Sequence, residues 1–376
     1  MTQYKKLLAA IVLFPAVASA QIAAAPPVNP VAFLYVSSGK NISAFAAASS
    51  GALTPVPGSP FDGDALSMAV NGKYLFATDD VSIYSYSIAF NGSLQQISTV
   101  NAQQYNGANC GGPVALFLDH SGSTLYDEDA YGNICANNTY QFFNVDNDTG
   151  ALNYAGMTSV ASEEFWVPLS IVGNNLFAYS ADCYHFEASL FGFRRNSNGT
   201  LAALNINPPM PPPPPQDFYC PYLSAEDPTD HLAVSVQALN DQSWQPDGPP
   251  QLATYTAGDD GNLTTTSTNE NMPTTAVENV TDIWMSPSGL LLAVGGTAGL
   301  QVFHFNGADP ITPYTGLLTT DPINQFFWDN ANHLYAISNS AGKLYVFTVT
   351  PQSVSAAPGS PYPISSPQNI IVLPKT

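Results

Sequence analysis

A short turn motif recurs along this chain and constrains its fold more than any other feature. In most copies a glycine stands one or two positions before an apolar residue that can begin a strand. The copies lie at residues 50–53, 91–94, 149–152, 198–201, 260–263 and 306–311, with a degenerate seventh at 352–354. Glycine supplies the positive φ angle that a tight hairpin needs. The copies recur about every 50 residues, the length of a four-stranded propeller blade.

The segments between these turns carry strand periodicity. Residues 74–77 form an apolar run, and residues 83–88 alternate Ile or Tyr with Ser, a period of two. Two apolar segments separated by a polar turn precede six of the hairpins, at residues 66–78, 114–126, 169–179, 222–236, 283–294 and 326–337. Each repeat therefore predicts four strands, labelled A to D in chain order. Sustained helical periodicity is missing from the pattern.

The two ends of the repeat region complement each other. Residues 31–36 enter on a B-type strand with no A strand before it, and residues 369–373 form an A-type strand with no blade of its own. Pairing them would remove the exposed sheet edges of an open β structure. The sequence therefore predicts an all-β fold: a seven-bladed β-propeller over residues 31–376, a single domain closed by pairing the C-terminal strand into the first blade.

The N-terminus has the pattern of a signal peptide at residues 1–20. Two lysines precede the apolar run 7–17, and the small residues 18–20 offer a cleavage site. Residues 21–30 form an Ala/Pro-rich lead-in. No later segment approaches the roughly 18 apolar residues of a membrane helix. We expect an exported protein, periplasmic or extracellular, that is a monomer and does not insert into a membrane.

Charge limits the partners. After residue 20, six Lys and Arg stand against 28 Asp and Glu. Such a surface repels phosphate backbones and anionic lipids, so we expect no nucleic-acid partner. In the same part of the chain, after residue 20, the only adjacent basic pair is Arg194 and Arg195, which disfavours compact phosphorylated ligands.

The four cysteines of an exported chain suggest disulfides. In a propeller, the B-to-C and D-to-A connections share one face, here called the top face, and long top-face loops are predicted at residues 127–138, 181–187 and 239–251. The proline run 208–215 joins two blades on the same side as a stiff spacer or, alternatively, a docking peptide. The repeat register places all four cysteines on this face and predicts the pairs Cys110–Cys135 and Cys183–Cys220.

Several blade segments resemble a known family. They are Gly-Pro-Val-Ala-Leu-Phe at 112–117 with His-Ser-Gly-Ser-Thr-Leu-Tyr at 120–126, and Pro-Gly-Ser-Pro at 57–60 and 358–361. Nearly all of the chain after the signal resembles the seven-bladed lactonase-type propellers, which include 6-phosphogluconolactonase-like enzymes. The resemblance implies a lactonase ancestry. Where that family commonly carries Arg-His after Gly-Pro, this chain has Val114 and Ala115, so the inherited catalytic groups are missing.

Two functions follow as expectations. The first is a protein that binds a small, carbohydrate-derived ligand, a glycan or a protein partner on its top face. The alternative is a lactone hydrolase acting on an unphosphorylated sugar-type lactone. A rebuilt catalytic site would use His185 as general base with Glu164, Asp217 and Tyr219.

Polar residues that enter A strands come nearest the channel mouth. They could bind a ligand there, although a water-filled acidic mouth would look the same in sequence. The candidates are Asp64, Glu163, Asp282, Gln325 and Gln368, together with Trp244 in the 239–251 loop. The other four histidines, His120, His231, His304 and His333, are assigned to surface or structural roles.

No cofactor is expected, and calcium is left open at two acidic clusters. Residues 146–150 look like half of a calcium loop but lack the closing Glu, so a hairpin turn is the preferred interpretation. Asp127, Glu128 and Asp129 form the second cluster.

Overall fold

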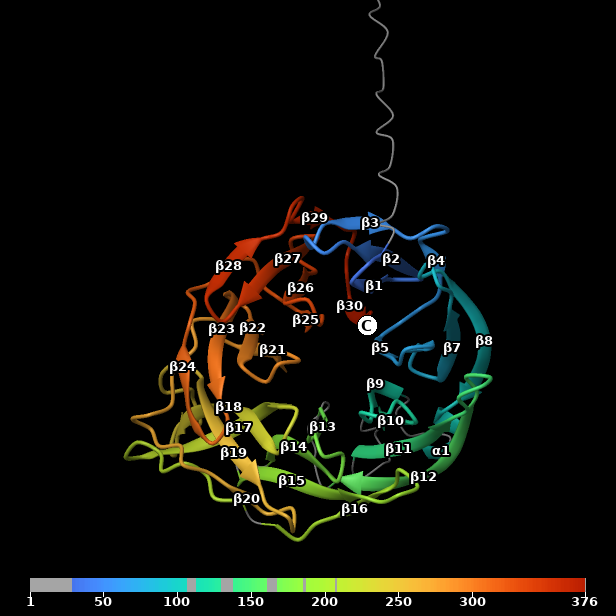
Figure 1. Ribbon diagram of the computed structural model, residues 1–376. Coiled ribbons are helices and arrows are strands. Elements are labelled where there is room, and N and C mark those ends of the chain that lie inside the picture. Colours follow the sequence, from blue (N-terminus) through green and yellow to red (C-terminus); the bar gives the residue numbers. More distant parts are fainter. Residues whose placement is uncertain are drawn as a thin grey trace, which may run out of the picture.

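The computed structural model describes residues 29–106, 113–129, 138–160, 168–184, 187–206 and 208–375. These residues form seven antiparallel sheets arranged in a ring around a central axis (Figure 1). The last strand, β30 (Asn369–Pro374), pairs with β1 (Ala32–Ser38), with Phe33 opposite Leu373. The predicted all-β seven-bladed propeller and its closure by the C-terminal strand are therefore confirmed.

Each blade runs from an A strand at the axis to a D strand at the rim, and blades are numbered in chain order. The A strands are β30, β5 (Ser67–Val70), β9 (Pro113–Leu118), β13 (Ser170–Ile171), β17 (Asp217–Glu226), β21 (Val280–Met285) and β25 (Gln325–Trp328). The B strands are β1, β6 (Tyr74–Thr78), β10 (Thr124–Asp129), β14 (Phe177–Tyr184), β18 (His231–Asn240), β22 (Leu291–Gly296) and β26 (His333–Ser338).

The outer half of each blade completes the pattern. The C strands are β2 (Asn41–Ala47), β7 (Ser82–Ile88), β11 (Asn138–Val145), β15 (Glu187–Arg195), β19 (Gln251–Ala257), β23 (Gly299–Asn306) and β27 (Lys343–Thr350). The D strands are β3 (Leu53–Pro55), β8 (Leu94–Asn101), β12 (Leu152–Val160), β16 (Leu201–Ala203), β20 (Leu263–Thr264), β24 (Asp309–Pro313) and β28 (Ser353–Ala356).

Three short elements complete the described fold. The strands β4 (Phe61–Asp62) and β29 (Tyr362–Pro363) add to β2 and β27, and each follows a Pro-Gly-Ser-Pro segment whose second proline is cis. The helix α1 (Gln103–Asn106) follows β8. Among the residues that the structure describes, no helix is long and apolar enough to cross a membrane.

The recurring glycine turns hold neighbouring blades together. Gly92 has φ 85°, and a Cβ placed on it would lie 2.5 Å from the ring of Phe33 in the preceding blade. The hydroxyl of Tyr35, on the same B strand, donates a 3.0 Å hydrogen bond to the Gly92 carbonyl. The same bond joins Tyr126 to Gly199 and Tyr179 to Gly261. Only glycine fits this turn, because the turn needs both the positive φ and the close approach.

Three predicted top-face loops are shorter than expected. The strand β10 continues through Asp129, β14 continues through Tyr184, and β18 continues through Asn240. Residues 127–129, 181–184 and 239–240 are therefore strand, and their assignment to loops is wrong. Their polar side chains hide the strand pattern in the sequence, whereas the backbone ladder forms regardless of side-chain polarity.

Candidate functional site

A cavity of about 270 Å³ lies on the axis of the ring and is lined by residues from the A strands of all seven blades. Its top end is at the first residues of these strands, including Ser67 of β5 and Asn369 of β30. Its bottom end is at their last residues, including Glu226 of β17. Because all blades contribute, no single repeat determines the chemistry of the cavity.

Polar residues near the top end bridge adjacent blades. The Oδ2 atom of Asp282 accepts a 2.9 Å hydrogen bond from the backbone N–H of Phe326 in the next blade. At the matching place one blade on, Gln325 accepts a 2.7 Å bond through Oε1 from the N–H of Ile370. Ser67 Oγ accepts a similar bond of 3.1 Å from the N–H of Leu116. These residues face the cavity and also fix the spacing of the blades.

Asp282 has an altered acidity. Burial raises the pKa of its carboxyl group to about 7, although hydrogen bonds from the N–H groups of Phe326 and Ile283 and the nearby indole of Trp284 act to lower it. A carboxyl group with this pKa is partly protonated at neutral pH, so it can donate as well as accept a hydrogen bond.

One acceptor at the top end is unused. Asn369, the first residue of β30, is 5% exposed, and its Oδ1 atom has no hydrogen-bond partner. It occupies the place that Gln325 and Ser67 occupy in their blades, and it lines the cavity. A buried carbonyl oxygen without a donor is costly, so this position favours a ligand or water that brings a hydroxyl or N–H group.

An aromatic wall lies beside these polar groups. The rings of Trp284 and Phe327 have centroids 4.4 Å apart with planes inclined by 42°, and both line the cavity together with Phe117. No hydrogen bond of normal geometry engages the buried Trp284 Nε1–H. The wall therefore offers flat apolar surface beside the Asp282 carboxyl group.

The bottom end carries a second polar group. Burial raises the pKa of Glu226, while His120 and a hydrogen bond from Ser170 oppose that rise. His120 Nε2 lies 2.6 Å from the carbonyl oxygen of Ile171, and Ser170 Oγ lies 3.0 Å from the carbonyl oxygen of Ser224. His120 and Glu226 line the cavity. From the sequence, His120 was assigned to a surface or structural role and Glu226 was not considered, because ligand candidates were sought only among residues that enter A strands.

The cavity is not a site for strong anions. Among the described residues that line it there is no Lys or Arg. The paired arginines lie elsewhere: Arg195 forms an ion pair with buried Asp119 and donates a 2.9 Å hydrogen bond to the Tyr126 hydroxyl. Arg194 lies over the ring of Phe177, 5.3 Å from its centroid. Neither guanidinium is placed to bind a phosphate in the cavity.

The sequence-predicted ligand residues divide into two groups. Asp282 and Gln325 line the cavity. Asp64 and Gln368 are exposed on the segments leading into β5 and β30, where Gln368 Oε1 accepts a 3.3 Å bond from the N–H of Gly39. Glu163, together with the catalytic candidates Glu164 and His185, lies outside the described residues.

The other two catalytic candidates are close to each other but away from the cavity lining. The Tyr219 hydroxyl lies 2.8 Å from Gln251 Oε1 and 2.9 Å from Asn269 Oδ1, toward the outer half of blade five. Burial, with smaller contributions from Glu270 and Asp217, raises the pKa of Tyr219 to about 12. The structure therefore brings its phenol to amide side chains of its own blade and not to Asp282.

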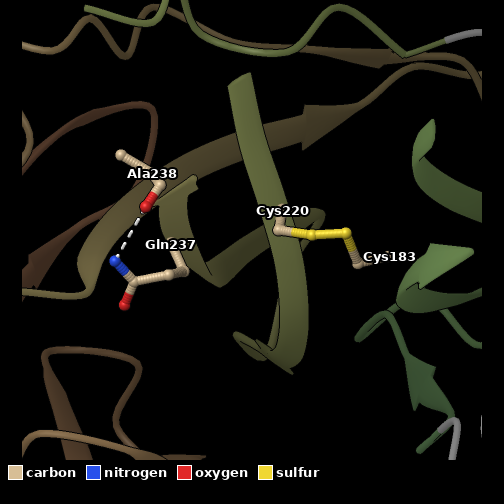
Figure 2. Close-up of a disulfide and its surroundings, with 4 residues drawn as sticks. All are labelled: Cys183, Cys220, Gln237 and Ala238. Carbon is tan, nitrogen blue, oxygen red and sulfur yellow. Dashed lines mark hydrogen bonds between the residues drawn. A yellow bond between two sulfur atoms is a disulfide. The ribbon is translucent and has the colours of Figure 1, made fainter. Parts of the chain in front are cut away.

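Blade five has long A and B strands, β17 and β18, of 10 residues each, whose top ends lie at Asp217 and Asn240. Trp244, in the loop after β18, is 43% exposed and meets Phe218 edge to face at 5.4 Å. A disulfide between Cys183 and Cys220 ties β17 to β14 of the neighbouring blade, as predicted (Figure 2). The predicted Cys110–Cys135 pair lies outside the described residues.

Two of the remaining histidines are parts of turns. His333 is 1% exposed, and its Nδ1 atom lies 2.8 Å from Asp329 Oδ2, which also accepts a bond from Tyr335. His231 meets Asp227 in the same way at 3.0 Å. Within the described ranges, no group of three or more His, Cys, Asp or Glu side chains is arranged to hold a metal ion.

Comparison with solved structures places this architecture among lactonase-type propellers. A candidate 6-phosphogluconolactonase from Bacteroides uniformis shares 14% identity and a TM-score of 0.64, covering 91% of this chain and 99% of that one. The periplasmic gluconolactonase of Pseudomonas aeruginosa shares 16% identity and a TM-score of 0.65, with 91% and 99% coverage. A protein from Lactobacillus plantarum shares 13% identity and a TM-score of 0.66, with 92% and 100% coverage.

No protein-family model and no curated protein matches this sequence. The chain is a seven-bladed β-propeller of four-stranded blades. Its fold is that of the lactonase-type propellers, to which the sequence motifs also point.

Proposed function

We propose that this protein binds a small, uncharged, hydroxyl-bearing ligand of carbohydrate origin in the top half of its central cavity. The observation that carries the proposal is the composition of the lining, in which an aromatic wall faces a small number of polar groups. Small-molecule sites are commonly mostly apolar, with a few polar groups that fix the ligand's orientation. The same lining lacks Lys and Arg among its described residues, which disfavours phosphorylated sugars.

The lining residues suggest how such a ligand would be held. The rings of Trp284 and Phe327 offer a surface for the C–H face of a sugar ring. The free Oδ1 atom of Asn369 would accept a hydrogen bond from a hydroxyl group. Asp282, with its pKa near neutrality, would accept or donate one. The names of two structural neighbours, a candidate 6-phosphogluconolactonase and a gluconolactonase, support a sugar-type ligand.

A second candidate function is hydrolysis of an unphosphorylated sugar lactone. It is favoured by Asp282, because a carboxyl group with pKa near 7 in a cavity has the acidity of a general base at neutral pH. Asp282 would remove a proton from water as the water oxygen attacks the lactone carbonyl. As the bond between the carbonyl carbon and the ring oxygen breaks, Asp282 would return that proton to the ring oxygen, which leaves as a hydroxyl group. The predicted quartet of His185, Glu164, Asp217 and Tyr219 is the other proposed arrangement for the same reaction.

We further propose that the protein is exported and works as a monomer, with residues 31–376 as one domain. The signal-like N-terminus, the disulfide between Cys183 and Cys220 and the periplasmic location of one structural neighbour support export. A protein or glycan partner on the top face is the competing form of the binding proposal.

The test is a titration of the purified protein with monosaccharides, aldonic acids and sugar lactones, each with its phosphorylated counterpart, followed by calorimetry. We expect binding of unphosphorylated compounds and a loss of affinity of about fivefold or more in Asn369→Ala and Trp284→Leu. Trp244→Leu is the matched control, because that indole lies outside the cavity lining, and it should keep wild-type affinity.

Turnover separates the two functions. The rate at which the protein consumes a lactone is measured by the acid released. Turnover by the wild type that falls in Asp282→Asn would establish a hydrolase. Binding without turnover would establish a binding protein. Affinity that is unchanged in both cavity variants would place the site elsewhere and overturn the proposal.

A further inference from the structure

Blade three contains a group of buried oxygen atoms that the cavity does not use. Asp127 and Asp129 lie two residues apart on β10, so their side chains share one face of the sheet. Gln141 of β11 stands directly opposite Asp127 in the antiparallel ladder. These residues form the seam cluster, named for its position at the seam between blades two and three, where Gln141 Nε2 donates a 3.3 Å bond to the carbonyl of Ala102.

All three members of the seam cluster are 0% exposed. Both carboxylate oxygens of Asp127, the Oδ1 atom of Asp129 and the Oε1 atom of Gln141 have no hydrogen-bond partner. The remaining oxygen of Asp129 accepts from Gln141 Nε2 and, at 3.2 Å, from Thr139 Oγ1. Every unpartnered atom is therefore an acceptor, and together they supply four oxygens.

Such a set needs either protonated carboxyl groups or a compensating positive charge. Burying a carboxylate away from water without a cation or donors costs several kcal/mol, and two adjacent carboxylates also repel each other. In the described part of the chain, the ion pairs formed by Lys, Arg and His engage other carboxylates, including Asp119, Asp321 and Asp329. No basic side chain is paired with the seam cluster there.

We propose that the seam cluster binds a single Ca²⁺ ion. Hard cations take oxygen ligands, and Ca²⁺ accepts carboxylate groups in mono- or bidentate fashion together with amide carbonyls and water. Asp127 would bind through both oxygens, and Asp129 and Gln141 through one each. Because Gln141 is also hydrogen-bonded to Ala102, the ion would fix blade three against the segment that leaves blade two.

The second acidic cluster of this blade is a poorer site and a useful comparison. Asp146 is exposed, and its Oδ1 atom already accepts hydrogen bonds of 2.9 Å from the N–H groups of Asp148 and Thr149. Those bonds account for the acidic sequence of the turn without an ion.

The experiment uses the protein stripped with a chelator and titrated with CaCl₂ by calorimetry, with the Tm measured in parallel. We expect one Ca²⁺ per chain and a rise in Tm of roughly 5 °C at saturation, because an ion that binds only the folded state stabilises it. Asp127→Asn and Asp129→Asn should each weaken binding at least about tenfold, which corresponds to the loss of one charged ligand. Asp146→Asn should bind as the wild type does.

Terbium luminescence gives a second readout that does not depend on stability. Burial raises the pKa of Tyr154, with smaller contributions from the nearby charge of Asp129 and from Tyr105. The phenol of Tyr154 is therefore close enough to sense the cluster, and it stacks on Tyr105 at 3.9 Å. Bound Tb³⁺ should therefore emit when tyrosine is excited, and Ca²⁺ should displace it. Tyr154→Phe should reduce the emission while calorimetry still shows Ca²⁺ binding.

Three outcomes would overturn the proposal: a stripped protein that binds no Ca²⁺, equal binding by the wild type and both seam-cluster variants, or binding that is lost in Asp146→Asn alone. Should either Asp variant not fold, Gln141→Met takes its place, since it removes a neutral ligand and leaves both carboxylates. Undiminished Ca²⁺ affinity in folded Gln141→Met would exclude the amide as a ligand and refute the site as assigned.

Discussion

The hydroxyl of Tyr179 donates a 2.8 Å hydrogen bond to the carbonyl oxygen of Gly261, 82 residues further along the chain and one blade further around the ring. Tyr179 is fully buried, and Gly261 has φ 84°. The pair joins the B strand of blade four to the C-to-D turn of blade five. The same hydrogen bond occurs between other blades. The recurring turn motif therefore forms a contact between neighbouring blades as well as a hairpin within one blade.

Removing the Tyr179 hydroxyl should weaken the contact between blades four and five. In Tyr179→Phe the Gly261 carbonyl loses its donor inside the protein, and we expect the free energy of unfolding to fall by about 1 to 3 kcal/mol. Urea denaturation followed by far-UV circular dichroism measures the change. Tyr84→Phe is the control, since the Tyr84 hydroxyl bonds to Asp79 at a more exposed site, and it should change stability by less than about 1 kcal/mol.

The turn glycine should tolerate no side chain. A Cβ on Gly261 would lie 2.6 Å from Leu204 Cδ1 and 2.7 Å from Phe177 Cε1, in addition to the cost of its positive φ. We expect Gly261→Ala to destabilise the fold by about 2 to 5 kcal/mol. Gly248→Ala isolates the backbone contribution, because Gly248 has φ 88° with open space around it, and should cost only about 1 to 2 kcal/mol. Equal losses in the two variants would show that packing contributes nothing.

The two adjacent arginines should differ sharply in importance. Arg195 pairs with Asp119, a carboxylate whose side chain is 0% exposed, and it also bonds to Thr124 at 3.1 Å. Arg195→Leu leaves that buried charge without a partner, so we expect the free energy of unfolding to fall by about 3 kcal/mol or more. Arg194→Leu, whose guanidinium only covers the ring of Phe177, should cost about 1 kcal/mol or less. Chemical denaturation at one pH and salt concentration compares them.

Asp282 should make stability fall as pH rises. Its pKa of about 7 in the folded protein lies above the ordinary value of 3.8, so folding favours the neutral carboxyl group. The ionisation penalty is absent below pH 4, grows between pH 4 and 7 and is complete above pH 7. Asp282→Asn removes it, so the stability of the variant minus that of the wild type should increase by about 2 to 4 kcal/mol from pH 4 to 8. A flat difference across this range would show that Asp282 titrates normally.

Fold and site differ in how far the sequence could predict them. The glycine at 92 and its counterparts marked six of the seven hairpins, and the unpaired A-type strand at 369–373 showed how the ring closes. The register even selected Cys183 and Cys220 as partners. Those signals work because turn geometry and strand alternation are local properties of a few consecutive residues.

The candidate functional site could be predicted from the sequence only in part. Asp282 and Gln325 were identified from their position at the start of A strands, but their hydrogen bonds to Phe326 and Ile370 needed the neighbouring blades. Glu226 and His120, at the other end of these strands, carried no pattern that distinguished them from turn residues.

The sequence by itself determined a propeller of seven four-stranded blades and its closure, because each repeat contains its own turn and strand chemistry. Only the tertiary structure decided which polar groups face one cavity, which arginine is buried and which carboxylates are buried away from water. Each of those outcomes depends on contacts between blades. Residues such as Asp119 and Arg195 lie 76 positions apart and become neighbours only when adjacent blades pack together.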